Sequence, residues 1–297
     1  MTQTTEQLEK VSNSTGFIAA LDQSGGSTPK ALAMYGVDQS EYSGDEEMYG
    51  KVHEMRTRIM TNEHFTGDKI LAAILFENTM QRKVQGKPTS RYLWEEKNVI
   101  PILKVDQGLA DQENGVQLMK PMPDLDALLN RAVDNGIFGT KMRSVIKLAN
   151  AEGIKQIVAQ QFEIGKQIIA KGLVPIIEPE VDIHSAEKAQ AEHILREQLL
   201  THLDTLGENE NVMFKLTLPQ SANFYQSCIQ HPNVLKVVAL SGGYSRADAN
   251  QKLSQNNGMI ASFSRALTEG LAAQQSDAEF SATLRASIDA IVAASST

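Results

Sequence analysis

The sequence is poor in cysteine, in long apolar runs and in basic charge, and each shortage excludes a class of protein. Cys228 is the only cysteine among 297 residues, so neither an internal disulfide nor a cysteine metal cluster can form. No apolar run can cross a bilayer, and the first residues lack the features of a secretion signal. The net charge of −8 argues against a nucleic-acid groove. We therefore expect a cytoplasmic protein that binds neither nucleic acid nor membrane.

Histidine is also sparse, and its spacing does not favour a metal site. His184, His193 and His202 are nine residues apart, which places successive rings on opposite sides of a helix. No proline- or glycine-rich linker, low-complexity tract or repeat interrupts the chain. We expect residues 1–297 to form one domain that uses no metal or other cofactor.

Eight apolar, β-rich segments alternate with stretches long enough to hold a helix. The segments are 16–22, 70–76, 99–106, 137–143, 173–181, 212–218, 234–241 and 259–264. Helical patterns occupy 154–169, 186–206 and 278–293. Eight strand–helix units predict a (β/α)8 TIM barrel of the α/β class, with an added helix at the C-terminal end. An open, doubly wound sheet is the alternative, but it gives no reason for eight comparable units.

One of these segments, Asn211-Val-Met-Phe-Lys-Leu-Thr-Leu-Pro219, places a lysine in the apolar middle of a strand. Side chains alternate along a strand, so Lys215 shares one face with Met213 and Thr217. Burial disfavours the ammonium form of a lysine, and the neutral amine is the form that attacks a carbonyl to give a Schiff base. The alternative is an edge-strand lysine that extends into water.

Charged and hydroxyl side chains stand at the ends of most of the other predicted strands. They are Asp22, Lys104, Asp106, Lys141, Arg143, Glu178, Glu180, Ser241 and Arg265. Barrel enzymes hold their active sites at the C-terminal ends of their strands. The pairs at 104/106, 141/143 and 178/180 are each two residues apart, so each pair shares a strand face and can point into the barrel. The pattern predicts a site that sets lysines opposite carboxylates.

The residue types favour imine chemistry on an anionic carbonyl substrate, because a buried amine stands near carboxylates and no set of metal ligands is evident. Ser241-Gly242-Gly243 offers backbone N–H groups and Arg265 offers a guanidinium, as at the phosphate site of many barrels. Ser24-Gly25-Gly26-Ser27 is a second candidate anion site, which we expect on the opposite side of the mouth. Two such sites predict a sugar that carries a phosphate at each end.

Seven segments spread over almost the whole chain carry recognisable motifs. They are Asp22-Gln-Ser-Gly-Gly-Ser27, Ile74-Leu-Phe76, Lys104-Val-Asp-Gln-Gly108, Lys141-Met-Arg143, Leu173-Val-Pro-Ile-Ile-Glu-Pro-Glu180, Leu240-Ser-Gly-Gly243 and Ser262-Phe-Ser-Arg-Ala-Leu267. Together they resemble the motifs of class I fructose-1,6-bisphosphate aldolases. The resemblance implies a metal-independent lyase of glycolysis and gluconeogenesis that cleaves fructose 1,6-bisphosphate through a Schiff base.

The resemblance also implies roles for individual residues. Lys215 would form the Schiff base, Glu178 would transfer protons, and Asp22 would assist carbon–carbon cleavage. Lys141 would stabilise developing charge, and Glu180 would either transfer a proton or orient a lysine. The residues that would bind the phosphorylated substrate are Ser241, Gly242, Gly243 and Arg265 at the C1 phosphate, Ser24, Ser27 and Lys104 near the C6 phosphate, and Arg143.

The sequence departs from animal and plant members of this family at several positions, and the departures resemble the bacterial branch. Gln23 replaces an acidic residue, Met142 an aromatic residue, Ser264 a glycine and Lys30-Ala31 a Lys-Arg pair, and the chain ends without the family's tyrosine. These changes leave the imine residues intact. They leave open the contacts at the C6 end and the assembly of a homo-oligomer.

Structural roles and other functions remain as alternatives. Glu178 could close the barrel end as an ion pair, and Arg143 could pair with Asp106 or another carboxylate without contacting substrate. We expect Arg56 and Arg58 on a solvated helix face, and Trp94 and Cys228 as packing residues. The functional alternatives are an imine-forming aldolase for sedoheptulose or tagatose bisphosphate, and a non-catalytic sugar-phosphate-binding scaffold.

Overall fold

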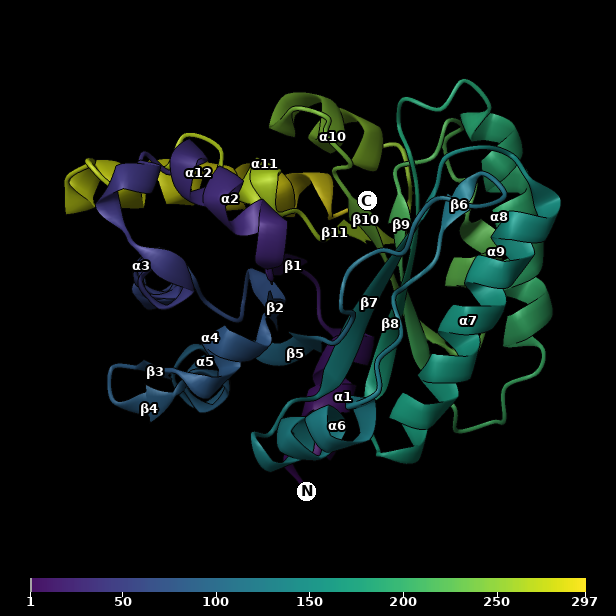
Figure 1. Cartoon of the computed structure of the whole chain (residues 1–297), viewed down its shortest axis with the longest axis horizontal. Coiled ribbons are helices and arrows are strands. Elements are labelled where there is room, and N and C mark those ends of the chain that lie inside the picture. The colour runs from purple at the N-terminus through teal and green to yellow at the C-terminus, as the bar shows by residue number, and fades with distance from the viewer. Residues whose placement is uncertain (1) are drawn as a thin grey trace.

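The computed structural model describes residues 2–297, and eight parallel strands form its central barrel (Figure 1). In their order around the barrel they are β1 (Phe17–Leu21), β2 (Ile70–Leu75), β5 (Ile100–Lys104), β7 (Gly139–Ile146), β8 (Val174–Val181), β9 (Val212–Thr217), β10 (Val234–Leu240) and β11 (Met259–Ala261). The backbone N–H of Ala20 donates to the carbonyl of Phe263 at 3.2 Å and so links β1 to the segment after β11. The predicted barrel is confirmed, and each predicted strand segment overlaps one of these strands, although β7 runs three residues past the predicted end at 143.

Helices surround the barrel. They are α1 (Gln3–Asn13), α2 (Thr28–Met34), α3 (Gly44–Thr61), α4 (Glu77–Gln81), α5 (Thr89–Lys97), α6 (Leu125–Asp134), α7 (Ala151–Ala170), α8 (Lys188–Leu203), α9 (Gln226–Ile229), α10 (Arg246–Leu253), α11 (Arg265–Thr268) and α12 (Asp277–Ala294), with short 3-10 turns at Gly25–Ser27 and Gln39–Glu41. The teal and green helices α7, α8 and α9 lie outside β7 to β9, and α3 to α5 lie on the other side of the barrel (Figure 1). The three helical patterns in the sequence correspond to α7, α8 and α12.

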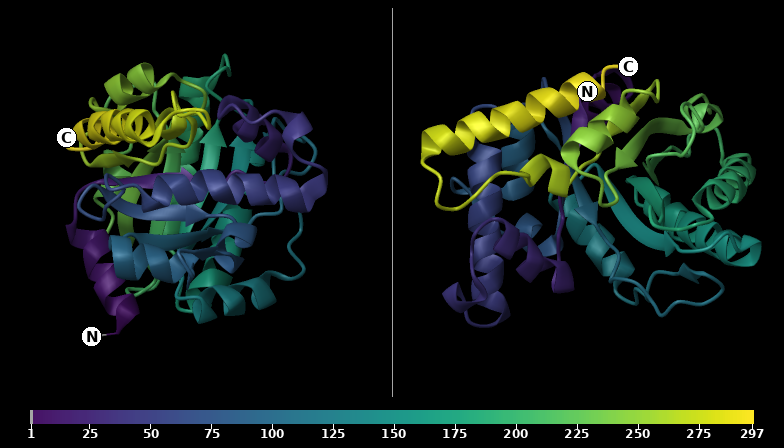
Figure 2. Two further views of the ribbon diagram at one scale, coloured as in Figure 1. Left: turned by 90° about the vertical axis from the view of Figure 1, so that its left-hand side faces the viewer. Right: turned by 90° about the horizontal axis from the view of Figure 1, so that it is seen from above.

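The expected extra helix at the C-terminal end is α12, the long yellow helix of Figure 2. Its Phe280 packs edge-on against Tyr35, the residue that follows α2, with ring centroids 6.4 Å apart. The Arg58 guanidinium of α3 lies 4.2 Å from the centre of the same ring. The backbone N–H of Ala261 donates to the hydroxyl of Ser295, just past the end of α12, at 3.0 Å. This part of the chain therefore covers the seam, meaning the junction of β11 with β1.

The barrel interior is apolar below its mouth. Ile18, Ile102, Ile176, Met213 and Val238 come from five strands and form one inner cluster of buried side chains. Val11 of α1 belongs to the same cluster, so α1 closes the N-terminal end of the barrel. Because Met213 points inward, Lys215 on the same strand face does so as well, closer to the mouth.

The two arginines of α3 do not face solvent, so the prediction of a solvated helix face is wrong. Arg56 is only 1% exposed. Arg58 is partly buried and donates to the carbonyls of Ala273 and Gln275 at 3.2 and 2.6 Å. The packing roles predicted for two other residues are confirmed, because Cys228 is buried and Trp94 packs against the inner cluster.

Two short strand pairs complete the fold. β3 (Lys83–Val84) and β4 (Lys87–Pro88) form an antiparallel hairpin, and β6 (Val116–Gln117) pairs antiparallel with β7. An isolated bridge between Leu109 and Met119 closes the arm that contains β6, at the C-terminal end of β5. Among residues 2–297, none of the helices has both the length and the apolar content needed to cross a membrane.

Candidate active site

A cavity of about 920 Å³ opens at the C-terminal ends of the strands, where the sequence predicts a site. Every predicted site residue except Gly243 lines it: Asp22, Ser24, Ser27, Lys104, Lys141, Arg143, Glu178, Glu180, Lys215, Ser241, Gly242 and Arg265. These side chains converge because residues two apart on a strand point to the same side, as predicted from the sequence for 104/106, 141/143 and 178/180. The residues that alternate with them along the chain point outward: Val105, Met142 and Ile177 are buried in the core between the strands and the helices.

Strand register brings the charged residues side by side. Lys104 of β5 lies opposite Lys141 of β7, and Arg143 of β7 lies opposite Glu178 of β8. Parallel strands place such neighbours about 4.8 Å apart, so two lysines on adjacent strands need carboxylates between them. The sequence supplies these carboxylates from β1, β8 and the segment after β5.

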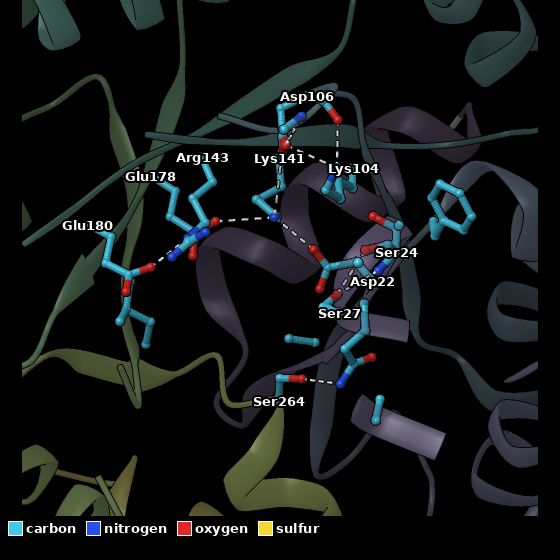
Figure 3. Close-up of a pocket in the computed structure, with 18 of the residues that line it drawn as sticks. Asp22, Ser24, Ser27, Lys104, Asp106, Lys141, Arg143, Glu178, Glu180 and Ser264 are labelled. Carbon is cyan, nitrogen blue, oxygen red and sulfur yellow. Dashed lines mark hydrogen bonds and ion pairs between the residues drawn. The ribbon is translucent and has the colours of Figure 1, made fainter. Parts of the chain in front are cut away.

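Lys141 is the centre of the resulting network (Figure 3). Its Nζ lies 2.7 Å from Asp22 Oδ2 and 3.2 Å from Glu178 Oε2. A third carboxylate, Asp106 Oδ2, lies 3.8 Å away. Each of these side chains is at most 11% exposed, so water screens the attractions only weakly.

The network sets the charge states of its members. Burial alone would raise the pKa of Asp22, but the charges of Lys141 and Lys215 outweigh burial and hold that pKa well below its ordinary value. Burial would lower the pKa of Lys141, but the carboxylates of Asp22 and Glu178 outweigh it and raise the pKa. At neutral pH the pair is therefore an ammonium ion beside a carboxylate.

Lys215 stands at the edge of this network. Its Nζ lies 3.2 Å from Glu178 Oε1, so one carboxylate bridges Lys215 and Lys141 through its two oxygens. Lys215 is 5% exposed and Glu178 is 3% exposed, which excludes the edge-strand alternative for the lysine. The backbone N–H of Glu178 donates to Gln161 Oε1 at 2.8 Å, and the Gln161 amide donates to the Ser144 hydroxyl at 3.0 Å. This buried support from α7 holds the β8 backbone in place.

Two further ion pairs flank the network. Arg143 Nε donates to Glu180 Oε2 at 2.6 Å, so the expected carboxylate partner of Arg143 is Glu180 and not Asp106. Burial would lower the pKa of Arg143, but the Glu180 carboxylate outweighs it and raises that pKa. The suggestion that Glu180 orients a lysine is wrong, because its partner is this arginine. Lys104 pairs with Asp106 Oδ1 at 2.9 Å and also donates to the Asp106 carbonyl at 2.5 Å.

The loop after β10 has the open backbone expected of an anion site. Gly242 and Gly243 have φ values of +59° and +119°, which side chains other than glycine rarely adopt. A Cβ on Gly242 would lie 2.9 Å from Ile183, and one on Gly243 would lie 3.6 Å from Arg265 Nη2. Glycine therefore keeps open the space between this loop and the Arg265 guanidinium. Gly243 lies behind this space and not on the cavity wall.

The second glycine–serine loop is placed differently from the prediction. It follows β1, which is separated from β10 only by β11, so it lies a quarter of the way around the mouth and not on the opposite side. The Ser27 hydroxyl donates to the Ser24 carbonyl at 2.9 Å and accepts from the Ser24 N–H at 3.1 Å. The strand opposite β10 is β5, which carries Lys104.

Asp106 and Lys120 line the site and Arg56 supports it from outside, and none of them was assigned a role from the sequence. Asp106 connects Lys104 to Lys141, and its spacing from Lys104 was the available signal. Lys120 lines the cavity from the arm after β5, where its N–H donates to the Gly108 carbonyl at 3.0 Å. Arg56 supports the β1 loop from α3, which no local pattern indicates.

Comparison with known proteins identifies the family. Residues 2–227 match the family model of class I fructose-bisphosphate aldolase. The class 1 fructose-bisphosphate aldolase of Synechocystis sp. is 64% identical over 292 residues, which cover 98% of this chain and 97% of that protein. Its counterpart in Porphyromonas gingivalis is 57% identical over 290 residues, 98% of each chain. The chain belongs to the class I fructose-bisphosphate aldolases.

Membership in this family makes the chain a lyase of the Schiff-base class, which requires a lysine in the site. A solved fructose-bisphosphate aldolase from Plasmodium falciparum shares the barrel, with a TM-score of 0.79 over 99% of this chain and 94% of that one. At 21% identity, this likeness shows the fold alone. The roles of individual residues in this aldolase therefore rest on the geometry above.

Proposed function

We propose that this aldolase reversibly cleaves fructose 1,6-bisphosphate into dihydroxyacetone phosphate and glyceraldehyde 3-phosphate through an imine on Lys215. The observation that carries the proposal is the buried contact of 3.2 Å between Lys215 Nζ and Glu178 Oε1. Lys141 is equally buried, but it contacts three carboxylates, which favour its ammonium form. Lys215 therefore suits nucleophilic attack, and Lys141 suits charge stabilisation.

Imine formation uses Lys215 and Glu178. The neutral Nζ of Lys215 attacks the C2 carbonyl carbon of the open-chain ketose, and a carbinolamine forms. Glu178 accepts a proton from the attacking amine and returns it to the carbinolamine oxygen, and it then delivers a second proton, taken up from solvent, to the departing hydroxyl group. One water molecule leaves, and the iminium ion that remains draws electrons from the neighbouring carbons.

Cleavage uses Asp22, which the Lys141 ammonium keeps ionised. Asp22 accepts the proton of the C4 hydroxyl group while the C3–C4 bond breaks. The electron pair of that bond moves into the iminium and forms an enamine, and C4 leaves as the aldehyde carbon of glyceraldehyde 3-phosphate. Asp22 returns its proton to C3 of the enamine, and hydrolysis of the resulting iminium by one water releases dihydroxyacetone phosphate, returns one proton to solvent and restores the Lys215 amine.

The two phosphates occupy different parts of the mouth in this proposal. Ser241 and Gly242, together with Arg265, hold the C1 phosphate through backbone N–H groups and a guanidinium, and Gly243 leaves room for that guanidinium. Lys104, on the opposite strand β5, stands at the C6 end, and Ser24 and Ser27 lie between the two sides. Arg143 contributes positive charge and is held in orientation by Glu180.

Borohydride trapping tests the covalent step. Incubation with dihydroxyacetone phosphate and borohydride should inactivate the protein and label Lys215, as read by peptide mass spectrometry. Lys141 is the internal control, because it is equally buried and lies in the same cavity. A label on Lys141, or no label with retained activity, would overturn the assignment of Lys215.

The substrate range and the biological setting need their own tests. Sedoheptulose and tagatose bisphosphates present the same C1 end, so kcat/KM on each ketose decides which one is preferred. We also propose that the enzyme acts in the cytoplasm and that it folds as a single domain. Cell fractionation tests the first proposal, and a single cooperative unfolding transition tests the second. A homo-oligomer is also proposed, and sedimentation over a range of protein concentrations tests it.

A further inference from the structure

A buried arginine outside the catalytic network supports the loop that carries Asp22. Arg56 of α3 is 1% exposed, and it forms no carboxylate ion pair within residues 2–297. Its guanidinium donates to the Gln23 carbonyl at 2.5 Å and to Thr79 Oγ1 at 2.6 Å. Burial lowers the pKa of Arg56 to about 10, while the Asp22 charge partly opposes this. Burying a charge is costly, so a role beyond general packing is expected of it.

The same arginine reaches the other side of the seam through Gln23. A second contact joins Arg56 Nη2 to Gln23 Oε1 at 3.4 Å, and the Gln23 amide N–H donates to the hydroxyl of Ser264. Ser264, labelled in Figure 3, belongs to the segment after β11. The chain of contacts therefore runs from α3 through the β1 loop to the residue before Arg265.

Gln23 and Ser264 contact each other across the seam, which joins the β1 loop to the segment after β11. A glycine at 264 would supply no hydroxyl group, and a carboxylate at 23 would have no N–H to donate to it. The interaction therefore needs both the Gln23 amide and the Ser264 hydroxyl. It lies where β1 and the β11 segment share a backbone hydrogen bond, from Ala20 to Phe263.

We propose that Arg56, Gln23 and Ser264 form a positioning relay that fixes Arg265 relative to Asp22. This inference rests on the proposed function, in which Asp22 assists cleavage and Arg265 binds the C1 phosphate. Each of these residues is adjacent in sequence to one member of the relay. The relay sets the distance between the phosphate anchor and the cleavage carboxylate, and substrate is held for cleavage only when that distance is correct.

Removing the relay should weaken phosphate binding first. Ser264→Ala deletes one hydroxyl group and Gln23→Leu removes the amide, and each should raise KM about three- to tenfold with a smaller fall in kcat. Arg56→Met also frees the β1 loop and should lower kcat/KM about 10- to 100-fold. Arg56→Lys keeps the charge and one contact, so it should recover part of that loss.

A double-mutant cycle with Arg265→Ala separates this role from a structural one. If the relay acts through Arg265, Ser264→Ala should raise KM in the natural protein and leave KM unchanged when Arg265 is already absent. Equal effects in both backgrounds would overturn the proposal. Borohydride labelling of Lys215 should persist in every relay variant, so a loss of labelling everywhere would instead contradict the proposed imine.

Arg58 provides a matched control on the same helix. Arg58 is partly buried, whereas Arg56 is fully buried. The partners of Arg58 are Ala273, Gln275 and Asp277, which lie ahead of and at the start of α12. Arg58→Met should lower the thermal midpoint without changing KM. If Arg56→Met lowers the midpoint by as much and also leaves KM unchanged, then Arg56 is only a structural residue.

Discussion

Two groups of cations line the same cavity, and they differ in how their charges are balanced. Around Lys141, each amine contacts a carboxylate: Lys141 contacts Asp22 and Glu178, and Lys215 contacts Glu178. Arg265 and Lys120 line the same cavity but form no ion pair within the part of the chain that the structure covers. The first group is balanced by the protein, and the second is available to an anionic ligand.

The difference separates the chemistry from the binding. Charges that are already paired keep their geometry without a ligand, so they are preorganised for proton transfer and for charge that develops during the reaction. Cations without a protein partner gain their partner when a phosphate binds. Loss of a paired group should therefore reduce kcat, and loss of an unpaired cation should raise KM.

The largest effect is expected at Lys215. Lys215→Met keeps the volume and removes the amine, so no imine can form and kcat should fall by on the order of 10⁵ or more. Glu178 keeps Lys141 as a partner in this variant, so the fold should persist. Steady-state kinetics and a thermal unfolding curve check both parts. A variant with kcat within a hundredfold of the natural protein would show that another lysine forms the imine.

The next effect is expected at Glu178, which bridges both lysines. Glu178→Gln keeps the shape and the hydrogen-bonding backbone but cannot transfer a proton, so kcat should fall about 10²- to 10⁴-fold with little change in KM. Circular dichroism should report a native fold. If the variant is unfolded while its remaining folded fraction turns over normally, Glu178 closes the barrel end and does not take part in the chemistry.

The sequence predicted the residues of the paired network well, because their positions follow from the pattern within single strands. Strand parity placed Lys104, Lys141 and Glu178 on inward faces, and the position of each strand end placed them at one mouth. Lys215 was identifiable for the same reason, since it stands in an otherwise apolar strand. These features depend on periodicity along one strand at a time, which a single sequence displays.

The remaining features depend on which strands and helices are neighbours. The β1 loop was expected opposite the β10 loop, but barrel closure brings β1 next to β11. Arg56 was expected on a solvated helix face, yet it is buried against Gln23 and Thr79, which come from other elements. Contacts between residues of different elements depend on the tertiary fold, so no pattern within α3 alone indicates that Arg56 is buried.

A smaller effect, on binding alone, is expected at Arg265. Arg265→Ala removes a charge-assisted contact worth roughly 1.5–3 kcal/mol and should raise KM about 10- to 100-fold. The KM for fructose 1-phosphate should rise by the same factor as the KM for fructose 1,6-bisphosphate, because both substrates carry the C1 phosphate. The KM of Arg265→Lys should lie between that of the natural protein and that of Arg265→Ala. A fall in kcat with unchanged KM would place Arg265 in the chemistry and erase the distinction between the two groups.

The smallest effect is expected at Lys120, an exposed cation that lines the cavity from the arm after β5. Lys104 is already paired with Asp106, so Lys120 is the lysine of that side that is available to the C6 phosphate. An exposed charge contributes about 0–1 kcal/mol, so Lys120→Ala should raise KM for the bisphosphate about two- to fivefold and leave fructose 1-phosphate unaffected. Lys83, exposed on β3 and not part of the cavity wall, is the matched control, since Lys83→Ala removes the same charge. If KM for the bisphosphate rises by the same small factor in both variants, then Lys120 acts only through the overall electrostatic field of the protein. Lys104 would then be the one cation that contacts the C6 phosphate.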